Sequence, residues 1–339
     1  MKILLDGFGG DNAPLSVLEG AARAVAAYGY EITLFGREQE LRQLAADRQL
    51  ALSGIEIVDT PDAISMHDEP RSILKAHKDS SMAAGLRALA AGEGDAFVSA
   101  GSTGALLMGA TFFVKRIRGI SRPALAPIVP SGKGPFLLID SGANVDCRPE
   151  MLLQFAHMGS VYMSQVVLGG KEASVGLLNV GTEDSKGGEL QHEAFRLLQE
   201  SGLRFVGNIE ARQAPDGACD VLVADGFSGN VLLKSMEGTA GMLLHSIKDI
   251  LLTNLRTKLG ALLIKPYLGS LKKQMSTEEY GGAPLLGVQK PVIKAHGNAT
   301  GATIQHAIRA AAVFAESNVT GRIAEAVAGE DATATEEPS

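Results

Sequence analysis

Short apolar runs alternate along this chain with longer segments in which apolar residues recur every three or four positions. The short runs are typical of buried strands and predict strands at 2–5, 31–35, 55–58, 96–99, 136–139, 174–179, 204–206, 221–224 and 291–294. The longer segments predict helices that include 15–28, 37–47, 80–91, 103–113, 151–165, 188–200 and 231–254. Because strands and helices alternate, we expect an α/β fold with a mostly parallel, doubly wound sheet.

Two segments depart from this alternation. From about residue 243 to residue 275 the chain is rich in leucine and in basic residues, with apolar positions at helical spacing. Gly260 and Pro266 interrupt that spacing, which predicts two short helices around a turn. Residues 328–339 are small or acidic, which predicts a disordered tail. We therefore predict a single α/β domain over residues 1–327, with a protruding basic amphipathic helical hairpin at about 243–275.

The composition fits a protein with a large buried core. Hydrophobic residues make up 45% and charged residues 20% of the 339 residues. The net charge of −7 argues against nonspecific binding to nucleic acid. Cys147 and Cys219 form no disulfide or metal pattern, the apolar run within residues 1–6 is too short for a signal peptide, and no run of about 18 apolar residues occurs. We therefore expect a cytoplasmic protein without a membrane-spanning helix.

Candidate chemistry lies in polar loops that follow predicted strands. In α/β sheets, ligands bind beyond the carboxyl ends of the strands. That rule selects five loops, at 6–14, 99–104, 140–148, 181–188 and 225–230. The sequence carries no G-x-G-x-x-G dinucleotide fingerprint, Walker A loop, G-x-S-x-G elbow or H-E-x-x-H pair. The common signatures of dehydrogenases, P-loop enzymes, serine hydrolases and zinc proteases are therefore missing.

The loops at 181–188 and 225–230 are the strongest candidates for an anion site. Their glycines let the backbone approach a ligand closely, and free N–H groups at a helix start favour an anion. Lys186 adds a mobile positive charge, and Asn230 can both donate and accept hydrogen bonds. Such loops could hold a phosphate-like group beside a reacting carbonyl.

The other loops have structural alternatives of similar weight. Asp11 or Asn12 can cap the next helix, and the hydroxyls of residues 102–103 can form a turn instead of binding an anion. Asp140 and Asp146 can bind a divalent cation or serve in a turn, and the turn is slightly favoured for Asp146. His296 can donate a proton, or it can be a packed neighbour of the site.

Six motifs in one order make the chain similar to a known family. They are Asp6-Gly-Phe-Gly-Gly-Asp-Asn-Ala-Pro14, Ser99-Ala-Gly-Ser-Thr-Gly-Ala105, Asp140-Ser-Gly-Ala-Asn144, Asn179-Val-Gly-Thr-Glu183, Asp225-Gly-Phe-Ser-Gly-Asn230, and Gly281-Gly-Ala-Pro-Leu-Leu-Gly287 with Lys294-Ala-His-Gly297. Over about residues 1–325 the chain resembles the bacterial phosphate acyltransferases, or acyl-ACP:phosphate transacylases, of phospholipid synthesis. One departure is Gly7-Phe8, where the family usually has Ala-Met.

The resemblance implies a fold similar to isocitrate and isopropylmalate dehydrogenases and to phosphotransacetylases. It also implies a homodimer that associates peripherally with the inner face of the cell membrane. The implied reaction transfers a fatty acyl group from acyl carrier protein to inorganic phosphate, gives acyl phosphate and uses no cofactor. The product would pass to a downstream membrane glycerol-phosphate acyltransferase.

The resemblance also assigns roles to residues of this chain. The catalytic lysine and asparagine of the family fall on Lys186 and Asn230, and no metal ligand is expected. The polar loops are expected to complete a substrate pocket, through Asp6, Gly9, Gly10, Asp11, Ser102, Thr103, Asp140, Asn144, Asp225, Ser228, Gly229 and His296.

The basic segment has three open interpretations. Between residues 242 and 275, six Lys or Arg residues and one Asp give a local charge of +5. The segment can pack in the core or at a dimer interface, lie on an anionic membrane surface, or dock the acidic carrier protein. The expected carrier or membrane contacts are Leu255, Arg256, Lys258, Leu259, Lys265, Lys272 and Lys273.

Two functions of other classes also stay open. An NAD(P)- and metal-dependent dehydrogenase of the same fold needs a dinucleotide site, and the missing fingerprint counts against it. A noncatalytic membrane-surface scaffold needs only the basic hairpin, and it leaves the polar loops unexplained.

Overall fold

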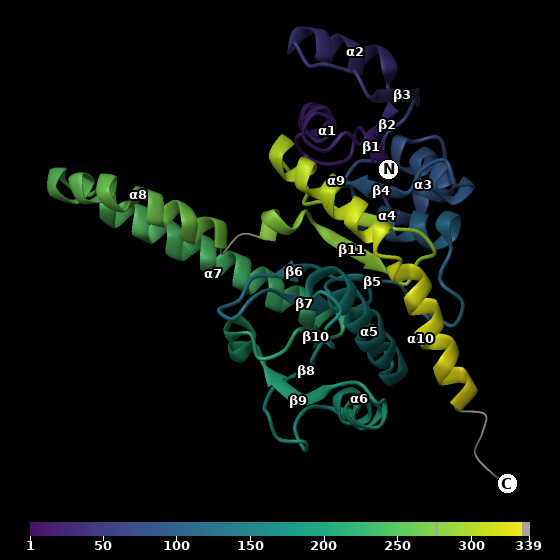
Figure 1. Cartoon of the computed structure of the whole chain (residues 1–339), viewed down its shortest axis with the longest axis vertical. Coiled ribbons are helices and arrows are strands. Elements are labelled where there is room, and N and C mark those ends of the chain that lie inside the picture. Colours follow the sequence, from purple (N-terminus) through teal and green to yellow (C-terminus); the bar gives the residue numbers. More distant parts are fainter. Residues whose placement is uncertain (275–276, 334–339) are drawn as a thin grey trace.

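Figure 1 shows the computed structural model, which describes the backbone of residues 1–274 and 277–333. Side chains are described for these residues except residue 266 and residues 269–274, 277–278 and 328–333. The chain forms an α/β body from which one helical hairpin protrudes.

The first sheet has seven strands in the order β3-β2-β1-β4-β12-β11-β5. The strands from β3 to β12 run parallel, and β11 is antiparallel to both of its neighbours. The bounds are β1 Lys2–Asp6, β2 Glu31–Gly36, β3 Ile55–Asp59, β4 Ala96–Ser99, β5 Ala124–Leu125, β11 Ala283–Leu286 and β12 Val292–Lys294. Their carboxyl ends therefore bring the loops after β1, β4 and β12 to one edge.

The second sheet has five strands in the order β6-β7-β10-β8-β9. All run parallel except β6, which is antiparallel to β7. The bounds are β6 Ile128–Val129, β7 Phe136–Ile139, β8 Val175–Asn179, β9 Phe205–Glu210 and β10 Val221–Val223. The chain enters this sheet after β5 and returns to the first sheet at β11, and one continuous cluster of buried apolar residues includes both sheets.

Helices cover the two sheets. Their bounds are α1 Leu15–Tyr28, α2 Glu38–Asp47, α3 Ser81–Ala91, α4 Thr103–Gly109, α5 Pro149–Tyr162, α6 Glu189–Glu200, α7 Gly226–Leu252, α8 Leu255–Gln274, α9 Gly301–Glu316 and α10 Val319–Thr333. A π-helical turn follows α4 at Ala110–Val114 and α5 at Met163–Val167, and short 3₁₀ helices lie at Pro70–Leu74, Ala211–Asp216 and Thr277–Tyr280. Helices α1 and α9 pack closely, because Gly20 leaves room for Ile304.

The predicted α/β class with mostly parallel strands is confirmed. Each predicted strand and helix overlaps an element of the structure, but the strands divide between two sheets instead of forming one. Strands β5, β6 and β11 were not predicted. The first two have only two residues each, and β11 contains Pro284, which is unusual inside a strand.

Helices α7 and α8 form the hairpin that protrudes from the body (Figure 1). The turn lies at residues 253–254, where Asn254 Oδ1 accepts hydrogen bonds from the backbone N–H groups of Arg256 and Thr257. The predicted turn around Gly260 and Pro266 is wrong, since α8 runs without a break through both positions. The side chains of two predicted contact residues, Lys272 and Lys273, lie outside the described residues.

The C-terminal helix α10 runs to Thr333, so the predicted boundary at residue 327 falls inside a helix. Residues 334–339 of the predicted tail lie outside the described residues. No helix in the described ranges is both long enough and apolar enough to cross a bilayer.

Candidate active site

Loops from both sheets meet around a cavity of about 460 Å³, which we call the central cavity. Loops after β1, β4 and β12 supply one side of it, and the loop after β7 and one face of α7 supply the other. Its polar and charged side chains are Asp11, Thr103, Ser141, Asn230, Lys234, Glu237, Lys294, His296 and Thr303. Its apolar wall is formed by Met66, Leu125, Pro127, Ile128, Leu233, Ala283 and Ala295.

Asp140 anchors the loop that follows β7. The carboxylate is completely buried and accepts hydrogen bonds from the backbone N–H groups of Leu125 (2.9 Å), Ser141 (2.7 Å) and Asn144 (2.6 Å). Burial raises the pKa of Asp140, although these hydrogen bonds act in the opposite direction. The Asn144 side chain donates to the carbonyl of Pro123 at 2.8 Å. These contacts hold the loop 140–144 against the strands, with Ser141 and Gly142 at the central cavity.

The first turn of α7 brings Asn230 to the central cavity. Asp225 caps the helix by accepting a hydrogen bond from the backbone N–H of Ser228 at 2.8 Å. Gly229 lies directly on the loop after β7, because a Cβ there would come within 1.9 Å of the Asp140 carbonyl oxygen. This close approach places the Asn230 side chain beside Gly142.

Lys294 brings a buried cation to the same cavity. Only 8% of the residue is exposed, and its ammonium donates hydrogen bonds to the carbonyls of Ala100 (3.2 Å) and Ala295. Burial lowers the pKa of Lys294 to about 8, against the raising effect of the carboxylates of Asp6 and Asp11.

Asp6 supports Lys294 from inside the protein. It is 3% exposed and accepts hydrogen bonds from the hydroxyls of Ser81 (2.6 Å) and Ser99 (2.7 Å). Burial raises the pKa of Asp6, while these two hydroxyls and the Lys294 charge favour the ionised form. Asp6 therefore fixes the strand ends on which the cavity is built.

Lys234 and His296 complete the polar side of the cavity. Lys234 follows Asn230 by one helical turn and pairs with Glu237 at 2.7 Å. His296 accepts a hydrogen bond at Nδ1 from the backbone N–H of Asn298 at 3.4 Å, so Nε2 carries the proton in the neutral ring. Two ammonium groups, an amide and an imidazole beside an apolar wall can hold an anion next to an apolar chain.

The loop that carries Lys186 borders a different cavity of about 850 Å³, which we call the outer cavity. Gly187 and Gly188 line it, together with Ser228 and Ser235 of α7. The outer cavity lies on the face of α7 opposite to that of Asn230. The loops 181–188 and 225–230 therefore do meet at one pocket, through Gly187, Gly188, Phe227 and Ser228, whereas Asn230 lines the central cavity.

Three of the predicted binding residues, Asp11, Thr103 and His296, line the central cavity with Asn230. Others hold loops in place. Ser102 caps α4, for example, and a Cβ at Gly9 would come within 2.4 Å of an Asp6 carboxylate oxygen. Direct contact with a substrate stays a prediction for Asp6, Gly9, Gly10, Ser102, Asp140, Asn144, Asp225, Ser228 and Gly229.

The sequence-based site missed both lysines of the central cavity. Lys294 ends β12 and lies in a motif already noted, but the loop after this strand was not among the five selected. Lys234 lies four residues after Asn230 on α7. Its position follows once the helix is known to begin at Gly226, because residues four apart share a face.

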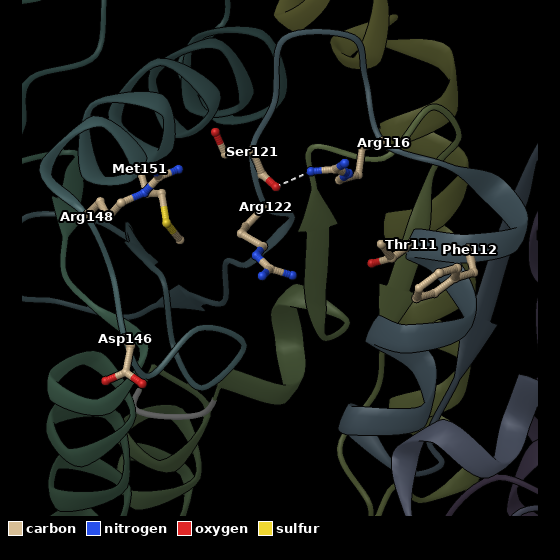
Figure 2. A pocket seen from close by; sticks show the side chains of 8 residues that line it. All are labelled: Thr111, Phe112, Arg116, Ser121, Arg122, Asp146, Arg148 and Met151. Carbon is tan, nitrogen blue, oxygen red and sulfur yellow. Dashed lines mark hydrogen bonds between the residues drawn. The ribbon is translucent and has the colours of Figure 1, made fainter.

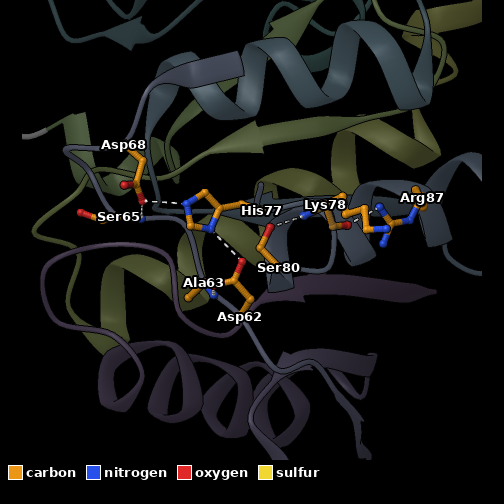
Figure 3. Close-up of polar contacts among 9 residues, drawn as sticks. Asp62, Ala63, Ser65, Asp68, His77, Lys78, Ser80 and Arg87 are labelled. Atoms are coloured by element: carbon orange, nitrogen blue, oxygen red, sulfur yellow. Dashed lines mark hydrogen bonds and ion pairs between the residues drawn. The ribbon is translucent and has the colours of Figure 1, made fainter. Parts of the chain in front are cut away.

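A histidine holds the loop that reaches this cavity from the side of β3. Figure 3 shows the His77 ring between two carboxylates, with Nδ1 2.7 Å from Asp62 Oδ2 and Nε2 3.6 Å from Asp68 Oδ2. The enclosed loop carries Met66 to the central cavity and leads to Arg71. Within the described residues, no group of His, Cys, Asp or Glu side chains is placed to hold a metal ion.

Solved structures with the same fold differ widely in sequence. A phosphotransacetylase from Streptococcus pyogenes aligns with a TM-score of 0.63 at 18% identity, over 93% of this chain and 94% of that one. A 4-hydroxythreonine-4-phosphate dehydrogenase from Klebsiella pneumoniae aligns with a TM-score of 0.54 at 13% identity, over 93% and 99%. These likenesses confirm the predicted fold, which the phosphotransacetylase and the dehydrogenase share with this chain.

Sequence relatives are much closer. A family model described as a fatty acid synthesis protein matches residues 1–322. A phosphate acyltransferase from Thermoanaerobacterium thermosaccharolyticum is 45% identical over 323 residues, which cover 95% of this chain and 96% of the relative. Another from Lysinibacillus sphaericus is 46% identical over 331 residues, which cover 96% and 98%. This chain is therefore an acyltransferase and belongs, with the phosphate acyltransferases, to the fatty acid synthesis protein family.

Proposed function

We propose that this protein transfers a fatty acyl group from acyl carrier protein to inorganic phosphate, with acyl phosphate as the product. The central cavity carries the proposal, because Asn230, Lys234, Lys294 and His296 line it opposite an apolar wall. The first set suits phosphate and the second suits an acyl chain. The relatives named phosphate acyltransferase support the same reaction.

In the proposed reaction, a phosphate oxygen attacks the thioester carbonyl carbon. The new C–O bond forms, the C–S bond breaks, and the carrier leaves as a thiol after taking up a proton. Phosphate is itself a nucleophile, so the protein has to position it and stabilise the oxyanion that develops. Lys294 and Lys234 offset the phosphate charge, and Asn230 donates to phosphate or to the oxyanion. The proton that hydrogen phosphate loses on attack passes to the leaving sulfur, and His296 Nε2–H donates a hydrogen bond to that sulfur as the negative charge develops there.

The test is incubation of the purified protein with acyl carrier protein bearing a fatty acyl group and with radiolabelled phosphate. We expect label in an organic-extractable acyl phosphate, in step with the release of carrier thiol. Thiol release that does not depend on phosphate would point to hydrolysis instead. No label and no thiol release would refute the proposal.

The catalytic role that the resemblance implies for Lys186 stays a prediction. Its side chain is exposed, so water weakens its attraction for an anion, and we expect Lys186→Ala to lower kcat about tenfold. The alanine should leave the melting temperature unchanged, because Lys186 makes no ion pair within the described residues. Steady-state rates with saturating acyl carrier substrate measure the effect. A variant with wild-type kcat and KM would remove Lys186 from the mechanism.

The hairpin suits peripheral attachment to a membrane, and we include this attachment in the proposal. The proposal also includes a homodimer, and a downstream membrane glycerol-phosphate acyltransferase that receives the product. Leu255 is 80% exposed and Leu259 65% exposed, with Arg256 and Lys258 beside them. Exposed leucines next to basic residues favour an anionic lipid surface.

Substituting Glu for Leu255 and Leu259 is therefore expected to move most of the protein from the pellet to the supernatant with anionic vesicles. The substitution removes two leucine side chains that would be buried in the lipid, and the two new carboxylates are repelled by the anionic headgroups. The matched control is Val206→Glu, an exposed apolar position on β9, which should still pellet. Sedimentation equilibrium shows whether the variant keeps its oligomeric state. Pelleting equal to that of the control would exclude the hairpin as the anchor.

A further inference from the structure

A strongly basic segment joins α4 to β5. The sequence Lys115-Arg-Ile-Arg-Gly-Ile-Ser-Arg122 has four basic residues in eight and no acidic one. The chain as a whole has a net charge of −7, whereas this segment is positively charged. The proposed reaction assigns it no role.

The segment borders two adjoining cavities, of about 690 and 560 Å³, that share Thr111, Phe112, Arg122 and Asp146. We call them together the arginine groove. Figure 2 shows Arg122 between Arg148, at the start of α5, and Phe112, in the turn after α4. Arg71 lines the far end, on the loop that His77 holds.

The arginines of the groove lack acidic partners. Within the described residues, Arg71, Arg122 and Arg148 make no ion pair, and Asp146 is the only acidic residue lining the groove. Arg116 is held by hydrogen bonds to the backbone carbonyls of Ile120 and Ser121. Unpaired guanidinium groups gathered in one concave surface raise the local positive potential and attract an acidic ligand.

Exposed apolar side chains lie among these charges. Phe112 is 58% exposed and Val145 is 62% exposed, and both line the groove. Arginine and aromatic residues are enriched at protein interfaces, where the aromatic ring supplies apolar area and the guanidinium binds carboxylates. This mixture suits an acidic protein surface better than a free inorganic ion.

The groove also adjoins the central cavity. Ser141 and Gly142 line the central cavity, while Val145 and Asp146 of the same loop line the groove. Helix α4 makes the same link, because Thr103 lines the cavity and Leu107 lines the groove. A protein bound in the groove is therefore separated from the reaction site by one loop. The hairpin, by contrast, points away from the body (Figure 1).

We propose that the arginine groove is the docking site of acyl carrier protein, whose acidic surface contacts Arg122 and Arg148. Docking there directs the thioester past the loop 140–146 into the central cavity. This inference rests on the proposed function and replaces the hairpin as the carrier contact. The hairpin is then left to the membrane.

The test compares two acyl donors, acyl carrier protein and a small acyl-pantetheine thioester that lacks the protein. For the double variant Arg122→Glu, Arg148→Glu we expect kcat/KM with the carrier substrate to fall by at least about tenfold at low salt. With acyl-pantetheine we expect no change, because the small donor bypasses the groove. The matched control, Arg256→Glu with Lys258→Glu in the hairpin, should keep wild-type kcat/KM with both donors. The neutral variant Arg122→Gln, Arg148→Gln should fall between.

The remaining outcomes would overturn either the docking site or the proposed function. Equal losses with both donors would show that the groove arginines serve folding or chemistry, and would overturn the docking site. Wild-type kinetics of the double variant with the carrier substrate would also overturn the docking site. That conclusion would hold even if the variant lost binding to anionic vesicles or changed its oligomeric state. Failure of the wild-type protein to form acyl phosphate from either donor would instead refute the proposed function, and the inference would fall with it.

Discussion

Replacing Asn230 with alanine is expected to lower kcat for acyl phosphate formation by about 100- to 1,000-fold, the usual effect of losing one oxyanion donor. The Asn230 side chain lies beside Gly142 at the central cavity, and no hydrogen bond to it is found within the described residues. Its amide is therefore available to a ligand. Binding of phosphate should weaken less than turnover, because the donor acts mainly on charge that develops in the transition state.

Two further variants separate hydrogen-bond donation from packing. Asn230→Asp keeps the shape of the side chain but replaces its N–H donors with an acceptor, so it should be at least as impaired as alanine. Ser235→Ala lies on the opposite face of α7, at the outer cavity, and should keep wild-type kcat. Melting temperatures should agree among all three, since exposed substitutions change stability by about 0.5 kcal/mol or less. An active Asn230→Asp would exclude donation by this side chain.

The fold could be predicted because most of its elements carry their own pattern. The buried strand 136–139 is a continuous apolar run, and the helix 15–28 has clear three- and four-residue spacing. Strand β5 has only two residues, and its place is decided by pairing with β11, far away in the chain. Division into two sheets depends on such pairings, which local periodicity does not encode.

The site was predictable where chemistry follows the end of a strand. Thr103 and Asn230 were found because their loops follow β4 and β10, and both line the central cavity. Lys186 was placed beside Asn230 because both loops look like anion sites. In the structure, Asn230 lines the central cavity, whereas Gly187 and Gly188 of the Lys186 loop line the outer cavity. Which face of a helix a loop meets depends on tertiary packing, so sequence alone could not separate the two cavities.

Lys294 is expected to make phosphate use depend on pH above neutrality. Burial lowers the pKa of Lys294 to about 8, so the ammonium loses its proton as the pH rises through that value. We expect kcat/KM for phosphate to be level below about pH 8 and to fall above it, approaching tenfold per unit. Lys294→Met should lower the level part by about 100-fold, the loss of a charge-assisted hydrogen bond, and abolish the pH dependence.

Stability provides an independent readout of the same group. The folded pKa of Lys294, about 8, lies below the usual value of 10.5, so the unfolded chain binds more protons between these values. The free energy of unfolding should therefore rise with pH across that window, by at most about 3 kcal/mol, and the destabilisation is fully present below it. Urea unfolding near pH 7.5 and near pH 10 measures the rise, which Lys294→Met should lack. A wild-type rise retained in Lys294→Met would show that another group titrates, and the alkaline fall in phosphate use would then have to be assigned to that group.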